Sequence, residues 1–370
     1  MNGLRINNYW TSSLLVLVST GLALLAAEYG LRWQRAQIEA SSQMDAGLLR
    51  YDANLGWGLN PLWRGRHRHH DFDVEYSTDL DAWRTSPDSV GKVPGQDVFW
   101  VGDSFTFGLG VGDGDTFVNR LNRSQPGVRH VNAGIPGFST DQEMLLVEQR
   151  VLRTRPGAVV LVVYLGNDLF DNRLPFPIQA ENAKPYFSLD DAGALVSHQL
   201  PVPRLRKPTD GSQPTLAEMT LGESASSVWA PIYGLELVRR LGLVSEPHGM
   251  GRVDGRYADE LALFAALLTR LHKAVADAGV RFQVVLLPSR RAVEQADGAM
   301  ADVQDYLAGK ILELAQAQGV TTLSLIPVLR AAQAAEPGSL FFPNEGHLTV
   351  QGHDVVARAL TGLVSAVSGE

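Results

Sequence analysis

Short apolar runs alternate with amphipathic stretches along most of this 370-residue chain. Runs rich in Val, Leu and Ile that have the length of buried strands lie at Val98–Val101, Val128–Asn132, Val159–Leu165, Phe282–Leu287 and Thr321–Ile326. Apolar side chains recur with helical spacing in residues 117–123, 141–152, 258–278, 301–318 and 351–367. Strands that alternate with helices pair in parallel. The pattern therefore predicts a three-layer α/β/α fold with a central parallel sheet of about five strands.

The longest apolar stretch lies near the N-terminus. Residues Tyr9–Ala27 are nineteen consecutive uncharged side chains, which is enough to cross a bilayer as a helix. Aromatic residues such as Trp10 and Trp33 flank this stretch, as is typical of membrane interfaces. We therefore predict a transmembrane anchor over residues 9–31, after a short tail of residues 1–8.

Two other interpretations of this stretch stay open. Arg5 precedes it, as a basic residue precedes the apolar part of a cleaved signal peptide. Cleavage after Ala27 would, however, place Leu25 where signal peptides carry a small residue. The stretch could also be a buried core helix. Counting Lys and Arg on its two sides does not favour export of the part that follows, but long domains cross membranes largely regardless of that count.

Residues 32–95 form a membrane-proximal segment before the alternating pattern begins. Period-2 alternation in Asp73–Asp79 is typical of a strand, and the segment is expected to hold one or two strands. The run Arg66–Asp73 contains three histidines that could ligate zinc. It specifies no fourth ligand, and its arginines repel a cation, so we expect a solvated edge strand or loop there.

Residues 96–370 are expected to form one domain with a long insertion at about residues 171–257. The insertion is rich in proline and interrupts the rhythm of strands and helices. Insertions of this length are lids, binding surfaces or disordered loops. We interpret it as a substrate-facing cap, with a surface elaboration as the alternative.

The strongest chemical signal is the sequence Gly102-Asp103-Ser104, which follows the first predicted strand directly. A serine at a turn from strand to helix meets the positive end of the helix and its free N–H groups. A nucleophile needs such donors, because attack on an ester carbonyl creates an oxyanion. The alternative is that Ser104 only caps the helix.

Three further polar blocks follow strands, where open α/β sheets carry their sites. They are Val131–Gly137 with Gly134, Tyr164–Asp168 with Asn167, and Asn344–Leu348 with His347. A glycine lets a backbone N–H approach a ligand closely, and an asparagine carries an amide donor. Four such blocks in this order are far more specific than any one of them.

This arrangement resembles the SGNH hydrolases, the GDSL-like esterase and lipase superfamily, from roughly Asp97 to the C-terminus. The four residues for which that family is named correspond here to Ser104, Gly134, Asn167 and His347. The resemblance implies a flavodoxin-like sandwich, with Ser104 as the nucleophile and His347 as the general base. The N–H groups of Ser104 and Gly134, with the side-chain amide of Asn167, would form the oxyanion hole.

The third member of the triad departs from the family pattern. Many members place an aspartate three residues before the histidine, where this chain has Asn344. Glu345 is the nearest acid, and a carboxylate stabilises an imidazolium as an amide cannot. We therefore predict that Glu345 orients His347 and that Asn344 is a turn residue capping the final helix. Asp168 is expected to orient Asn167 or a substrate hydroxyl, or to cap a turn.

Composition narrows the partners and cofactors. The net charge of −8, from 32 basic and 40 acidic residues, argues against a nucleic-acid partner. The chain has no cysteine, which excludes disulfides, thiolate catalysis and cysteine-bound zinc. The glycines of Gly108–Gly112 lack the spacing of a dinucleotide-binding loop. We expect neither a cofactor nor a metal, and the oligomeric state cannot be read from the pattern.

The resemblance and the apolar helix together predict a membrane-anchored serine esterase. Anchored members of the family resemble exported, envelope-facing enzymes, so we expect a single-pass protein with its catalytic domain on the periplasmic side. The expected substrate is an O-acyl ester, with O-acetyl preferred, of an envelope or exported glycan, and a lipid ester is the next choice. Two other functions stay open, namely an O-acyltransferase with the same triad and a non-catalytic partner in polysaccharide assembly.

Overall fold

The structure, a computed structural model, describes residues 6–89, 97–208, 237 and 255–368. Its centre is a five-stranded parallel sheet in the order β12-β11-β8-β6-β7. The strands are β6 (Val98–Gly102), β7 (His130–Gly134), β8 (Ala158–Tyr164), β11 (Arg281–Leu287) and β12 (Thr321–Ser324). Counted along the chain, the spatial order is 2-1-3-4-5, which is the flavodoxin-like order. The predicted fold class is confirmed.

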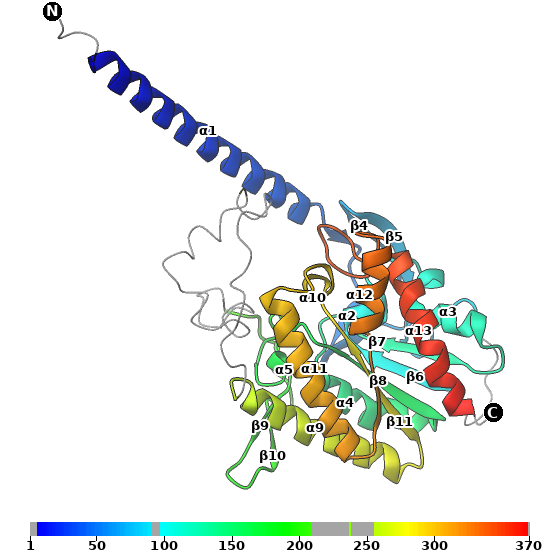
Figure 1. The fold of residues 1–370 in the computed structure, drawn as a ribbon. Helices are drawn as coiled ribbons and strands as arrows, with labels where there is room; N and C mark the ends of the chain where they lie inside the picture. Colours follow the sequence, from blue (N-terminus) through cyan, green and yellow to red (C-terminus); the bar gives the residue numbers. More distant parts are fainter. Residues whose placement is uncertain (1–5, 90–96, 209–236, 238–254, 369–370) are drawn as a thin grey trace, which may run out of the picture.

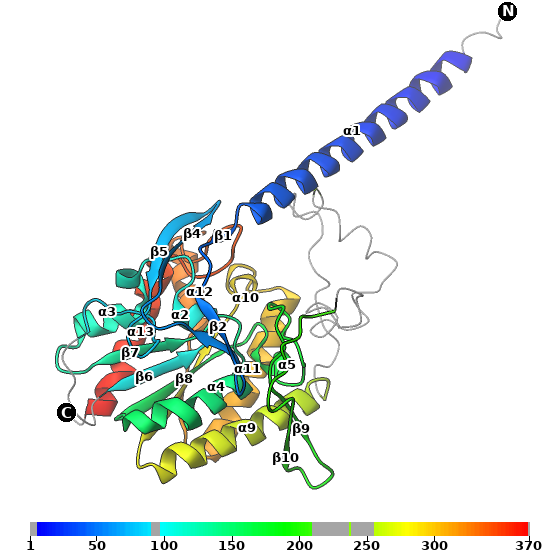
Figure 2. The same cartoon turned by 180° about the vertical axis from the view of Figure 1, so that it is seen from behind.

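Helices cover both faces of the sheet (Figures 1 and 2). One layer consists of α3 (Phe117–Ser124), α12 (Ile326–Ala335) and α13 (Val350–Ser368), and the other of α4 (Thr140–Leu146), α9 (Ala258–Asp277) and α11 (Ala299–Ala317). Successive side chains of a strand point to opposite faces. Trp100 and Val162 accordingly pack with the first layer, whereas Phe99 and Leu161 pack with the second.

Short elements connect these layers and depart from the predicted bounds. They are α2 (Ser104–Phe107), α5 (Asp168–Asp171), α10 (Arg290–Glu294) and the 3-10 turns Asp113–Asp115 and Leu152–Thr154. The single helix predicted over residues 141–152 is divided, because a π turn at Val147–Val151 follows α4. The strand predicted to reach Ile326 ends at Ser324. α12 begins at Ile326 with a proline in its first turn, where no N–H partner is needed.

The segment before the sheet domain folds onto it. Its strands are β1 (Gln43–Met44), β2 (Leu49–Asp52), β3 (Gly56–Leu59), β4 (Arg64–His69) and β5 (Phe72–Ser77), which pair as the hairpin β2–β3 and the antiparallel sheet β1-β4-β5. Trp57, Tyr76 and Trp83 are buried in the same core as α4 and α9. The expected solvated edge at Arg66–Asp73 is therefore corrected in part, because His67 is buried with its Nδ1 2.9 Å from Tyr76 Oη.

A helix of 35 residues, α1 (Ile6–Ala40), precedes this segment and projects away from the body of the protein (Figures 1 and 2). Its most apolar window, within Trp10–Ala40, has a mean hydropathy of 1.8 and is 6% buried. Large apolar side chains such as Leu15 and Leu25 are exposed. The helix is long and apolar enough to span a membrane, a test that a signal sequence near an N-terminus also passes.

The insertion is described in part. It contains the hairpin of β9 (Tyr186–Leu189) and β10 (Leu195–His198), which packs on α4 and α9. A fully buried ion pair between Lys184 and Asp141 joins this part of the insertion to α4. Residues 209–236 and 238–254 of the predicted cap lie outside the described residues.

The seating of α2 against β7 generates the first prediction. A Cβ atom at Gly134 would lie 2.2 Å from the backbone nitrogen of Phe107, so Gly134→Ala forces backbone to move. We expect a loss of about 1–3 kcal/mol in the free energy of unfolding, the usual range for overpacking, measured by urea denaturation.

Gly309→Ala is the matched control, because Gly309 lies inside α11 and nothing approaches its added Cβ within 4 Å. This change should be neutral or stabilise the protein by up to about 1 kcal/mol. Equal effects of the two substitutions would contradict the close packing of α2 on β7.

Candidate active site

Ser104 is the first residue of α2 and is separated from β6 by Asp103 alone. The Asp103 carboxylate accepts the N–H of Phe105 at 2.8 Å, so Asp103 is the residue that caps the helix. The alternative that Ser104 is only a cap is therefore wrong. The Ser104 hydroxyl oxygen instead lies 2.7 Å from Nε2 of His347.

His347 lies between Ser104 and the acid predicted for the third position. Its Nδ1 is 2.7 Å from Oε1 and 2.8 Å from Oε2 of Glu345, and its backbone N–H donates to Oε2 at 3.0 Å. An ionised carboxylate only accepts hydrogen bonds, so Nδ1 carries the proton and the Nε2 lone pair faces Ser104. The ring of Phe105 packs against the imidazole with centroids 4.3 Å apart.

Opposing effects set the protonation of this pair. Burial acts to lower the pKa of His347, but the Glu345 carboxylate and the more weakly acting Asp103 raise it above the ordinary value of 6.5. Burial acts to raise the pKa of Glu345, yet the charge and hydrogen bonds of His347 lower it below its ordinary value. Glu345 is therefore ionised at the pH at which His347 titrates.

Three buried carboxyl groups lie behind α2. Burial raises the pKa of Asp103 to about 6, although nearby His347 acts to lower it. Burial, with repulsion from other carboxylates, raises the pKa values of Glu143 and Asp168 well above their usual range. Burial therefore disfavours the ionised form of both groups.

Asn344 was expected to cap the final helix, but it does not. Its backbone N–H and its side-chain amide both donate to Asp71, at 2.8 and 2.6 Å. The first turn of α13 is instead capped by Thr349, whose hydroxyl accepts the N–H of Gly352 at 3.1 Å. Asn344 is a turn residue, as predicted, but its partner comes from the β4–β5 turn.

Asn167 follows β8 and is buried. Its Nδ2 donates to Asp171 at 2.6 Å, one turn along α5, whereas Asp168 accepts the N–H of Tyr164 at 2.7 Å. Asp171, and not the expected Asp168, thus orients Asn167. The spacing of four residues on a helix is the sequence signal that could have identified Asp171. Among the residues that the structure describes, only one of the two amide hydrogens of Asn167 Nδ2 has an acceptor.

The glycines after β7 differ in what their N–H groups do. The Gly134 N–H donates to Oδ1 of Asn132 at 3.1 Å, so it is already engaged. Gly137, the last residue of the same predicted block, has a φ of +81°, and within the described part of the chain its N–H has no hydrogen-bond partner. The carbonyl of the Pro136–Gly137 peptide accepts the Trp57 indole N–H at 2.9 Å, which orients the peptide plane.

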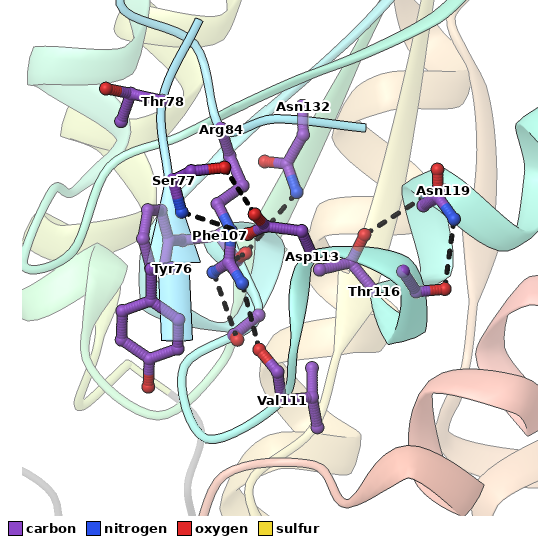
Figure 3. A network of polar contacts seen from close by, with 12 residues as sticks. Tyr76, Ser77, Thr78, Arg84, Phe107, Val111, Asp113, Thr116, Asn119 and Asn132 are labelled. Carbon is purple, nitrogen blue, oxygen red and sulfur yellow. Dashed lines mark hydrogen bonds and ion pairs between the residues drawn. The ribbon is translucent and has the colours of Figure 1, made fainter. Parts of the chain in front are cut away.

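A buried arginine holds the other end of α2 (Figure 3). Arg84 donates to the carbonyls of Phe107 and Val111 at 3.1 and 2.9 Å, and its Nε lies 2.6 Å from Asp113. Its guanidinium also lies over the rings of Tyr76 and Phe107, about 4 Å from each centroid. No motif marks Arg84 in the sequence, because its partners come from several segments.

A cleft of about 360 Å³ opens beside His347 and Glu345. Its apolar lining comes from Phe105, Tyr164 and Met300, and its polar lining includes Gln179, Ser289, Arg290 and Gln304. Gln179 belongs to the insertion, so part of that segment borders the candidate site. Among the residues that the structure describes, no three His, Asp or Glu side chains are grouped to hold a metal ion.

Comparison with known proteins identifies the class. The profile of the GDSL-like lipase/acylhydrolase family matches residues 100–355, which is more than half of the chain. The chain therefore belongs to this family, and it is an ester hydrolase. No curated protein sequence matches it.

Several solved structures are similar at low identity. A member of the lipolytic protein G-D-S-L family from Veillonella parvula is 13% identical, with 73% of this chain and 98% of that chain covered and a TM-score of 0.36. An acetyl xylan esterase from Geobacillus stearothermophilus is 13% identical, with coverages of 74% and 95% and a TM-score of 0.40. A lipase/acylhydrolase from Enterococcus faecalis is 14% identical, with coverages of 72% and 96% and a TM-score of 0.37.

The contact between His347 and Glu345 generates the second prediction. The pKa of His347, followed by NMR of its imidazole nitrogens, should lie above 6.5. Glu345→Gln should lower it, because the attraction of the carboxylate is lost while burial still disfavours the charged ring. Glu313→Gln is the control, since Glu313 is an exposed carboxylate of α11 that pairs with Lys310 at 2.8 Å, and this change should leave the His347 pKa unchanged. An unaltered His347 pKa in Glu345→Gln would contradict the ion pair.

Proposed function

We propose that Ser104, His347 and Glu345 form the catalytic triad of this ester hydrolase. The observation that carries the proposal is the continuous contact from Ser104 Oγ through the imidazole to the Glu345 carboxylate, with both links at 2.7 Å. Glu345 holds the Nδ1–H tautomer, so Nε2 can take the serine proton. This is the arrangement of a nucleophile, a base and an orienting acid.

The reaction then runs through an acyl-enzyme. Ser104 Oγ attacks the ester carbonyl carbon as its proton passes to His347 Nε2, and the imidazolium is stabilised by Glu345. His347 gives the proton to the departing alkoxide oxygen, which leaves as an alcohol. Water then attacks the acyl-serine with His347 again as the base. The carboxylic acid is released, and the Ser104 hydroxyl is regenerated.

The oxyanion is assigned to three donors. The N–H of Ser104 belongs to the first residue of α2, where no intrahelical partner exists. Asn167 supplies the second hydrogen of its Nδ2. Gly134 was expected to supply the third donor, but its N–H is engaged by Asn132. We assign this role to the N–H of Gly137 and give Gly134 the role of seating α2.

The substrate proposed is an O-acyl ester, with O-acetyl preferred, of an envelope or exported glycan. The cleft supports it, because amide, hydroxyl and guanidinium groups of Gln179, Gln304, Ser289 and Arg290 line it beside the apolar side chains. Such groups can hydrogen-bond the hydroxyls of a glycan. Relative rates on p-nitrophenyl acetate and p-nitrophenyl palmitate test the choice, since a preference for palmitate would favour a lipid ester.

The third prediction concerns the nucleophile. Ser104→Ala should abolish hydrolysis of p-nitrophenyl acetate, with a loss on the order of 10⁶ in kcat, because nothing else can form the acyl-enzyme. A serine-directed phosphonate should label the wild type and leave Ser104→Ala unlabelled. Circular dichroism serves as the control for folding. Retention of more than a few per cent of the activity would refute the assignment of Ser104.

The fourth prediction concerns α1, which we propose to be an uncleaved single-pass anchor with the catalytic domain on the periplasmic side. Its exposed apolar surface supports an anchor. The intact mass of the membrane-extracted protein should therefore include α1, and carbonate washing should leave the protein in the membrane fraction. A mature N-terminus near Glu28 would identify a signal peptide instead.

A further inference from the structure

The loop that carries the acid and the histidine is bound by a carboxylate from outside the predicted blocks. Asp71 lies in the turn between β4 and β5, and its side chain is 3% exposed. Its Oδ2 accepts the N–H groups of Asn344 and Glu345 at 2.8 and 2.9 Å, and its Oδ1 accepts the side-chain amide of Asn344 at 2.6 Å. Three donors of two consecutive loop residues thus converge on one buried carboxylate.

The loop depends on such contacts because it contains no regular secondary structure. A bridge between Phe341 and Leu348 closes its base, and Gly346 turns the chain with a φ of +93°. Arg290 donates to the carbonyls of Phe342 and Pro343 on one side. On the other side Asp71 receives the N–H groups that come next along the chain, so it sets where the backbone of Glu345 lies.

From this geometry we infer that Asp71 is a positioning residue that holds Glu345 in line with His347. Both carboxylate oxygens of Glu345 lie within 2.8 Å of Nδ1, so a small shift of the Glu345 backbone relative to the imidazole breaks the contact. A displacement of about 1 Å in an active site can cost about 100-fold in rate. The inference rests on the triad proposed above.

The hydrogen-bond donors around Asp71 stabilise its ionised form. Burial acts to raise the pKa of Asp71, but the hydrogen bonds from Asn344 and Glu345 outweigh it and hold that pKa below its ordinary value. Charge-assisted hydrogen bonds of this kind are about twice as strong as neutral ones. Asp71 also lies outside residues 100–355, the part matched by the family profile. The N-terminal segment of residues 32–95, which contains Asp71, therefore contributes to the site.

The fifth prediction uses the isosteric change Asp71→Asn. We expect kcat on p-nitrophenyl acetate to fall by about 10- to 100-fold with KM within about threefold, because the triad is misaligned while the cleft is unchanged. Asp73→Asn is the matched control, since Asp73 is a half-exposed carboxylate of the same hairpin that pairs with Arg66. The control should keep wild-type kcat.

A double-mutant cycle with Glu345→Gln separates positioning from a general loss of stability. In the wild type we expect Glu345→Gln to lower kcat by up to about 10⁴-fold. In the Asp71→Asn background the same change should cost much less, because Glu345 no longer supports His347. Multiplicative effects, or a wild-type kcat in folded Asp71→Asn, would overturn the inference.

Asn344→Ala keeps the test possible where Asp71→Asn does not fold. It removes one of the three hydrogen bonds and should lower kcat by about 3- to 10-fold, less than Glu345→Gln does. A larger loss in Asn344→Ala than in Glu345→Gln would overturn both the inference and the role of Glu345. Full activity of Ser104→Ala refutes the proposed function itself, so the two failures are distinguishable.

Discussion

The position of the Ser104 hydroxyl depends on the seating of a four-residue helix against the ends of two strands. A helix as short as α2 has no stability of its own, so its surroundings must hold it. Gly134 has no side chain to collide with the backbone of α2, and the buried Arg84 donates to the carbonyl of Phe107, the last residue of the helix. Burying a guanidinium costs several kcal/mol, which excellent hydrogen bonding must offset. Asp113, two backbone carbonyls and two aromatic rings provide that compensation in one place.

The other half of the site is held by the same N-terminal segment. Arg84 binds α2, Trp57 orients the peptide before Gly137, and Asp71 binds the loop of Glu345. These contacts come from β3, from the β4–β5 turn and from the residues after β5. The segment joins the core of the sheet domain through Trp57, Tyr76 and Trp83. The three loops to which the site is assigned are thus all contacted by one folded segment. Movement of that segment would alter all of them together.

The sequence was sufficient for features that follow from local pattern. The five strands of the parallel sheet, Ser104 after β6 and Glu345 beside His347 lie close to where the pattern placed them. The partners Asp71 and Arg84 could not be predicted, because each contacts residues distant along the chain and no periodicity records such pairing. The role of Asp171 could have been predicted from its spacing of four residues from Asn167. Asp168, which is adjacent to Asn167, was predicted in its place. The proposed assignment of an oxyanion donor to Gly137 instead of Gly134 depends on the hydrogen bond from the Gly134 N–H to Asn132. The sequence does not reveal this hydrogen bond.

The geometry of α1 bears on which substrate the proposed anchor favours. A helix of 35 residues is about 52 Å long at 1.5 Å per residue, whereas the hydrocarbon core of a bilayer is about 30 Å thick. In the proposed anchor the uncharged part fills that core, and the part from Glu28 onward carries the ion pairs Glu28–Arg32 and Arg35–Glu39. For a proposed anchor that stands upright in the bilayer, residues 28–40 extend roughly 20 Å beyond the hydrocarbon core. α1 ends at Ala40 and β1 begins at Gln43, so no long linker lets the cleft descend to the lipid surface. A site held at that height suits a glycan outside the membrane better than an ester within it.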